Sequence, residues 1–160
     1  MTADQARTLY SIQEPTNNLN ATILTMSMKK TISSENAPKA KGLLSPAILY
    51  SSKYTMELSG QIGINPQEGK LVDGGIEAET EQTLKNIRAL LSEVGWNFKN
   101  IVKVRIFLAD MKDYSVVNNI CTKYFTEELP TRIALAVKEL PLGALVEIEC
   151  VAVGDEVAGS

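Results

Sequence analysis

Two helical patterns alternate with β patterns along this chain, and their order restricts the fold more than any other feature. In the first helical segment, Leu84, Ile87 and Leu91 recur at a helical spacing. The second covers Tyr114–Phe125. Between them, Ile101–Leu108 has an apolar residue at every even position and carries Lys103 and Arg105 on the other face, as a half-buried strand does. A strand bounded on both sides by amphipathic helices predicts a domain of the α+β class.

Four further segments have the length and composition of strands. We expect Ala47–Ser51 and Tyr54–Ser59 to form a hairpin around a tight turn. Near the other end, Thr131–Val137 and Leu145–Val153 read as two more strands, and a short connection between them predicts a second hairpin. With one further short strand before the first helix, the segments together predict a sheet of about six strands with two helices on one face.

The patterned part of the chain forms one expected domain, residues 29–155, which suits a length of 160 residues. Residues 1–28 lack a clean period, and we expect a disordered tail there, with a second short tail at 156–160. No apolar run approaches the ~18 residues of a membrane span, so no membrane association is expected. We expect a cytoplasmic protein, with a mitochondrial location as the alternative.

One face of the last predicted strand mixes acidic and aliphatic side chains. Glu147 and Glu149 share it with Val151 and Val153. Such a face suits a subunit interface better than open water, so we predict a homo-oligomer.

The absence of histidine excludes most familiar catalytic and metal centres. Histidine bases, serine–histidine nucleophiles and histidine-ligated metals are all ruled out. Cys121 and Cys150 form no CxxC motif, and we expect both to be reduced and buried. A net charge of −3 with no basic block gives nucleic-acid binding little support, so no nucleic-acid partner is expected.

Two charged positions are unusual enough to be candidate functional residues. Arg132 opens an apolar strand, where its guanidinium demands a partner: either a rim carboxylate or the carboxylate of a ligand. Glu147 and Glu149 lie two apart on one strand face, which fits either cross-strand pairing or general acid–base work. A metal site is not expected, because a hard cation needs more oxygen ligands than this pair supplies.

Several blocks of the sequence, in order and at family spacing, resemble the RidA (YjgF) family of reactive-intermediate deaminases. The resemblance extends across residues 29–153. Its blocks are Ser34–Ala40 with Gly42, Leu58–Ile62, Asn65-Pro66, Gly69–Val72, Ile101–Val104, Asp113-Tyr114, Val117-Asn118, Pro130–Leu135, Leu140-Pro141 and Val146–Glu149.

The resemblance implies a chorismate-mutase-like subunit with a six-stranded mixed sheet, assembled as a homotrimer with clefts between subunits. It implies hydrolysis of 2-enamines and 2-imines, such as 2-aminoacrylate and 2-iminopropionate, to 2-keto acids and ammonia, without a cofactor. The alternative is a non-catalytic trimer of the same family that binds small carboxylates or acts as a translation inhibitor or chaperone-like protein.

The resemblance also assigns roles to individual residues. Arg132 matches the arginine that binds the substrate carboxylate, and Glu147 matches the glutamate that positions and deprotonates water. Gly60 and Asn118 match positions lining the cleft, and the backbone of Ala134 matches a carbonyl that helps hold the water.

The chain departs from the family at Leu44, which stands where active members usually carry a tyrosine. The hydrogen bond of that phenol is lost and the predicted cleft becomes more apolar. This change supports the non-catalytic alternative, or a preference for larger imino acids.

The predicted C-terminal hairpin places Arg132 opposite Cys150 or Val151, which leaves Glu147 roughly 10–13 Å away along the strand. That is long for a three-carbon substrate to bridge. We therefore expect a site shared between Arg132 of one subunit and Glu147 of another.

Overall fold

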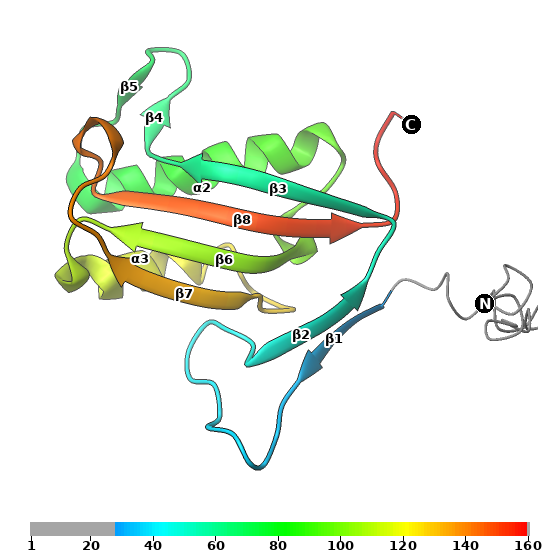
Figure 1. Ribbon diagram of the computed structural model, residues 1–160. Helices are drawn as coiled ribbons and strands as arrows, with labels where there is room; N and C mark the ends of the chain where they lie inside the picture. The colour runs from blue at the N-terminus through cyan, green and yellow to red at the C-terminus, as the bar shows by residue number, and fades with distance from the viewer. Residues whose placement is uncertain (1–27, 160) are drawn as a thin grey trace, which may run out of the picture.

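A four-stranded sheet forms the centre of the molecule, in the order β3–β8–β6–β7 (Figure 1). The computed structural model describes residues 28–159. Strand β6 is parallel to β7, whereas β8 is antiparallel to both β3 and β6. The strands are β3 (Tyr54–Gln61), β6 (Ile101–Leu108), β7 (Thr131–Ala136) and β8 (Val146–Gly154). The predicted tail at residues 1–28 lies outside the described residues except for Met28, where the first strand begins.

Two helices cover one face of this sheet, as predicted (Figure 1). Helix α2 (Gly75–Glu93) has the predicted buried stripe and is followed by Gly95 at a φ of 75°, a left-handed conformation that suits glycine. Helix α3 (Tyr114–Cys121) is shorter than predicted. After Cys121 the chain continues in hydrogen-bonded turns and no longer as a regular helix. In these turns the Phe125 amide donates to the Cys121 carbonyl at 3.0 Å.

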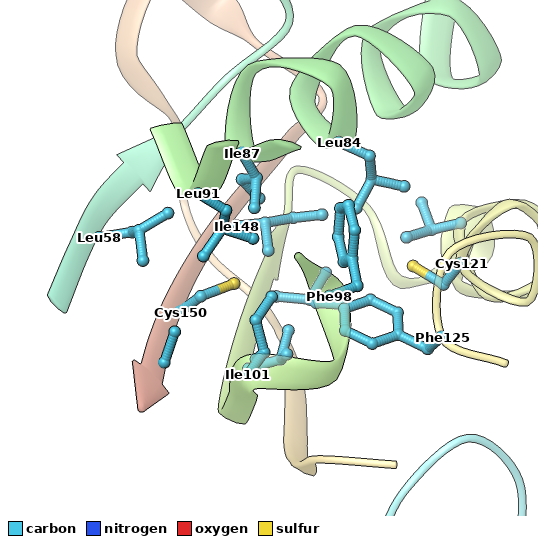
Figure 2. Close-up of a cluster of buried hydrophobic side chains, with 14 of the residues drawn as sticks. Leu58, Leu84, Ile87, Leu91, Phe98, Ile101, Cys121, Phe125, Ile148 and Cys150 are labelled. Carbon is cyan, nitrogen blue, oxygen red and sulfur yellow. The ribbon is translucent and has the colours of Figure 1, made fainter. Parts of the chain in front are cut away.

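The core lies between the helices and the sheet (Figure 2). Alternate residues of β6 and β8 point toward the helices, and each buried aliphatic side chain contributes about 1.5–3 kcal/mol by leaving water. Both cysteines are buried and unpaired, as expected. Burial raises the pKa of the Cys121 thiol to about 11 and also raises that of Cys150. The fully buried members include Leu84, Ile87, Leu91, Ile101, Val104, Ile106, Leu108, Val117, Val146 and Ile148.

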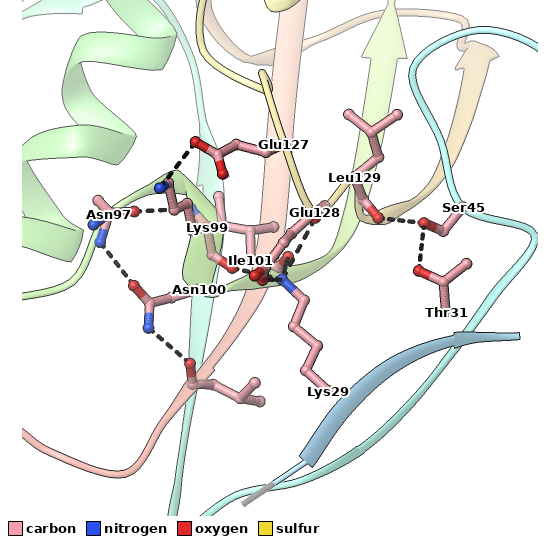
Figure 3. Close-up of polar contacts among 11 residues, drawn as sticks. Lys29, Thr31, Ser45, Asn97, Lys99, Asn100, Ile101, Glu127, Glu128 and Leu129 are labelled. Carbon is pink, nitrogen blue, oxygen red and sulfur yellow. Dashed lines mark hydrogen bonds and ion pairs between the residues drawn. The ribbon is translucent and has the colours of Figure 1, made fainter.

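Strands β1 (Met28–Ile32) and β2 (Ala47–Ser51) pair with each other and stand apart from the central sheet (Figure 1). We call residues 28–51 the arm. Polar contacts attach it to the segments that precede β6 and β7 (Figure 3). The Lys29 ammonium donates to the Lys99 carbonyl at 2.5 Å, and the Ser45 hydroxyl donates to the Leu129 carbonyl at 2.5 Å.

Both predicted hairpins were wrong in their pairing, although the strands themselves are confirmed. Strands β2 and β3 do not pair. The two residues between them are bound to the C-terminal segment instead, where the Asp155 carboxylate accepts hydrogen bonds from the Ser52 hydroxyl and the Lys53 amide. Strands β7 and β8 do not pair either, because β6 lies between them.

The described residues therefore form a four-stranded sheet and two separate strand pairs, and not the expected six-stranded sheet. The second pair is β4 (Ile64–Asn65) with β5 (Lys70–Leu71). The mixed strand directions and the two helices on one face agree with the predicted α+β class. No helix among residues 28–159 is long and apolar enough to span a membrane.

Candidate functional site

Arg132 lies on β7 with its side chain on the helix-covered face of the sheet. Its strand partner is Val104, whose side chain is buried beneath the helices. The Nη1 atom of Arg132 donates a hydrogen bond to Oδ1 of Asn118 at 2.8 Å. The ring of Tyr114 lies 5.5 Å from the Arg132 Cζ atom, which is within cation–π range. The structure therefore brings Arg132 and Asn118 together.

The remaining donors of Arg132 have no partner. Its Nε and Nη2 atoms are buried and make no hydrogen bond within residues 28–159. These two atoms form one side of the guanidinium fork, and their N–H bonds point the same way. Leaving charged donors buried and unpaired is costly, and the geometry of this edge matches a carboxylate bound through two hydrogen bonds. A cavity of about 290 Å³ adjoins Arg132 beside Lys103, Thr131 and Ile133.

Glu147 lies on β8 and faces the side of the sheet that the helices leave uncovered. Gly60 of β3 packs directly against it, because a Cβ atom built on Gly60 would lie only 1.7 Å from Oε1 of Glu147. The structure therefore brings these two predicted site residues into contact. The neighbouring Glu149 forms an ion pair with Arg105, whereas the Glu147 carboxylate has no ion-pair partner within residues 28–159. Glu147 is thus free to act on a ligand or water.

Ala134 and Leu44 lie on the Arg132 side of the structure. Ala134 pairs with Ile106 and packs against the core from the edge strand β7. Leu44 is partly buried in the arm, next to Ser45, whose amide donates to the Pro130 carbonyl at 2.8 Å. The arm thereby holds Leu44 near the start of the strand that carries Arg132.

The two groups of site residues lie on opposite faces of the sheet. Arg132 is opposite Val104 on β6, while Glu147 is opposite Phe107, three residues further along. Two strand spacings and three residues separate their Cα atoms by about 14 Å. The predicted pairing of Arg132 with Cys150 or Val151 was wrong, since β6 intervenes, but the wide separation within one chain stands.

Sequence reasoning assigned no site role to Tyr114. An aromatic residue at the start of an amphipathic helix is ordinarily a core residue, so its type alone gave no signal. Its spacing could have given one, because Tyr114 and the predicted cleft residue Asn118 are four residues apart and share one face of α3.

No metal centre is present in the part of the chain that the structure describes. Within residues 28–159, no three histidine, cysteine, aspartate or glutamate side chains lie together in a way that could hold an ion. The charged groups that the structure places in the two half-sites are the Arg132 guanidinium and the Glu147 carboxylate.

Comparison with known proteins places the chain in one family. Residues 34–154 match the family described as endoribonuclease L-PSP. The chain is 44% identical over 126 residues to the 2-iminobutanoate/2-iminopropanoate deaminase of Rattus norvegicus, which covers 79% of this chain and 90% of that protein.

Solved structures agree with this match. A putative endoribonuclease from Thermotoga maritima superposes with a TM-score of 0.62 at 39% identity, covering 80% of this chain and 99% of its own. E. coli TdcF with bound serine gives a TM-score of 0.58 at 30% identity, covering 78% of this chain and 98% of its own.

Proposed function

This chain belongs to the endoribonuclease L-PSP family, and we propose on that premise that it is a 2-iminobutanoate/2-iminopropanoate deaminase. Such an enzyme adds water to the carbon of a 2-imino acid and releases a 2-keto acid and ammonia. The observation that carries the proposal is the unpartnered Nε–Nη2 edge of Arg132, since 2-imino acids and their 2-enamine tautomers carry the carboxylate that this edge fits. The bound serine of the TdcF relative is likewise an amino acid with a carboxylate.

Arg132 and Glu147 divide the reaction between them. Arg132 binds the substrate carboxylate and so fixes the imine carbon in place. Glu147 accepts a proton from a water molecule as the oxygen of that water attacks the imine carbon, and the C=N electron pair moves to nitrogen. The same carboxyl then returns its proton to the nitrogen, which gives a carbinolamine. It next accepts the proton of the carbinolamine hydroxyl as the C=O bond forms and passes that proton to the nitrogen, so the C–N electron pair leaves with ammonia.

The remaining site residues shape the pocket around these two. Asn118 holds Arg132 from the side opposite its free edge, and the backbone of Ala134 offers a carbonyl acceptor for the attacking water. Gly60 leaves the room that the Glu147 carboxylate occupies. Leu44 brings an apolar side chain to the Arg132 side, which favours an imino acid with an alkyl side chain over a polar one.

We further propose that the active site forms between two subunits of a homotrimer. The opposite-face placement of Arg132 and Glu147 supports this, because no small substrate spans about 14 Å through a sheet. Exposed apolar side chains on the uncovered face, Ile133 at 47% and Leu135 at 43%, also favour burial against another copy.

The six-stranded sheet of the family is part of the same proposal. Strand β3 has a free edge within residues 28–159, and only Ser52 and Lys53 separate it from β2. Two residues are the usual length of a hairpin loop, so the arm could fold back onto β3 and complete the sheet.

A coupled assay tests the deaminase. An amino-acid oxidase generates the 2-imino acid, and semicarbazide traps whatever imine remains. The chain is expected to lower semicarbazone formation, and Arg132→Ala is expected to abolish the effect. If the wild-type chain binds 2-ketobutyrate and yet leaves the semicarbazone yield unchanged, the non-catalytic alternative replaces the deaminase.

Mixed assemblies test the shared site. Arg132→Ala and Glu147→Ala chains are unfolded together, mixed in equal amounts and refolded. If each site takes its two residues from neighbouring copies, about a quarter of the sites regain both, and activity should recover toward a quarter of wild type. Verified mixing without recovery would show that each site is built within one chain.

A further inference from the structure

We propose that Tyr114 is a positioning residue that orients the guanidinium of Arg132 for a ligand carboxylate. This inference deepens the proposed function and rests on it, since it concerns the same half-site. Tyr114 and Asn118 hold the guanidinium through two different interactions, one between the Tyr114 ring and Cζ and one from Nη1 to Asn118.

The two contacts constrain different motions of the arginine. The hydrogen bond from Nη1 to Asn118 fixes one end of the guanidinium at 2.8 Å but still permits rotation about that contact. The Tyr114 ring, with its centroid 5.5 Å from Cζ, restricts that rotation by attracting the cation as a second point of contact. The one edge left free is Nε–Nη2, the edge that lacks a partner.

The ring is itself held in place. Tyr114 is partly buried and packs against the core cluster, and Asn118 follows it by one helical turn. Both contacts to Arg132 therefore come from the same face of one short helix. A guanidinium oriented before the ligand arrives loses less freedom on binding, so removing the ring should weaken ligand binding and leave the chemical step unchanged.

Two substitutions separate the ring from its hydroxyl. Tyr114→Phe keeps the aromatic face, and Tyr114→Leu removes it while keeping an apolar side chain in the core. We expect Tyr114→Leu to raise the Kd for 2-ketobutyrate, measured by calorimetry, by about 2- to 30-fold, the range that cation–π interactions span. The KM for the imine should rise by the same factor with kcat within about twofold, whereas Tyr114→Phe should stay near wild type.

Tyr124→Leu is the matched control. Tyr124 also carries an arginine over its ring, Arg88 at 4.9 Å, but it lies at the far end of the α3 region and makes no contact with Arg132. We expect it to lower stability without changing the Kd for 2-ketobutyrate. If Tyr114→Leu fails to fold, Tyr114→Met, which fills the space with an unbranched and more adaptable apolar side chain, takes its place.

The outcomes distinguish this inference from the deaminase proposal. An unchanged Kd in Tyr114→Leu, or a fall in kcat at constant KM, would overturn the positioning role while leaving a deaminase intact. A wild-type chain that binds 2-ketobutyrate through Tyr114 but hydrolyses no imine would overturn the deaminase and keep the positioning role. A wild-type chain without either property would overturn both.

Discussion

Replacing Gly60 by alanine should displace the Glu147 carboxylate and slow the chemical step. The added Cβ would lie 1.7 Å from Oε1 of Glu147, whereas real Cβ atoms essentially never approach another heavy atom closer than 3.0 Å. The carboxylate oxygen must therefore move by at least about 1.3 Å. Misplacing a reacting group by about 1 Å can cost on the order of 10²-fold in rate, so we expect kcat to fall by about that factor.

Binding should be spared, because the substrate carboxylate is bound by Arg132, which in the proposed shared site comes from the neighbouring subunit. The KM in the coupled semicarbazide assay and the Kd for 2-ketobutyrate should therefore stay within about threefold of wild type, a factor that corresponds to a small free-energy change. The backbone of Gly60 is not in the left-handed region, so alanine introduces no backbone strain there.

A double-mutant cycle isolates the effect. In a Glu147→Ala background the carboxylate is absent, and adding Gly60→Ala should cost nothing further. If Gly60→Ala lowers kcat equally in both backgrounds, or leaves kcat unchanged in the wild-type background, the proposed catalytic role of Glu147 beside Gly60 is refuted.

Three further predictions concern stability and reactivity. Hydrogen bonds from Lys123 and Tyr124 hold the pKa of Glu81 below its ordinary value, so the ionised carboxylate stabilises the fold above that value and this stabilisation is lost as the pH falls. In urea unfolding, the free energy of unfolding should therefore decrease less between pH 5 and pH 3 for Glu81→Gln than for wild type. Burial raises the pKa of Cys121 to about 11, so only about one thiol in a thousand is ionised at pH 8, and alkylation by iodoacetamide should be negligible until urea unfolds the chain. Leu84 is fully buried, and Leu84→Ala should lower the free energy of unfolding by about 2–5 kcal/mol in urea denaturation with a nearly unchanged m-value.

Local patterns predicted the elements of this fold better than their pairing. The alternation over Ile101–Leu108 and the helical stripe through Leu84 and Leu91 each record which side of one segment is buried, and the structure confirms both. Pairing depends on contacts between distant segments. The composition of β7 and β8 does not indicate that β6 lies between them. The short connection between β7 and β8 wrongly predicted that they were neighbours.

In the candidate site, too, local features could be predicted from the sequence, whereas the relative placement of distant residues could not. Arg132 was recognisable because a guanidinium in an apolar strand needs a partner, and the structure leaves one edge of it unpaired. Its placement on the face opposite Glu147 could not be predicted, because it depends on the register of both strands with β6. Tyr114 was missed because a tyrosine that supports an arginine has the same sequence signature as one that fills a core.

The strand order has a consequence for synthesis of the chain on the ribosome. Strand β8 lies between β3 and β6 and pairs with both. The hydrogen bonds that β3 and β6 make to β8 therefore form only after residues 146–154 have been synthesised. Until those residues emerge from the exit tunnel, the nascent polypeptide exposes two unsatisfied strand edges and the apolar underside of α2. Completion of the central sheet therefore depends on residues 146–154, and a folding intermediate that lacks them exposes the kind of unpaired strand edge and apolar surface that promotes aggregation.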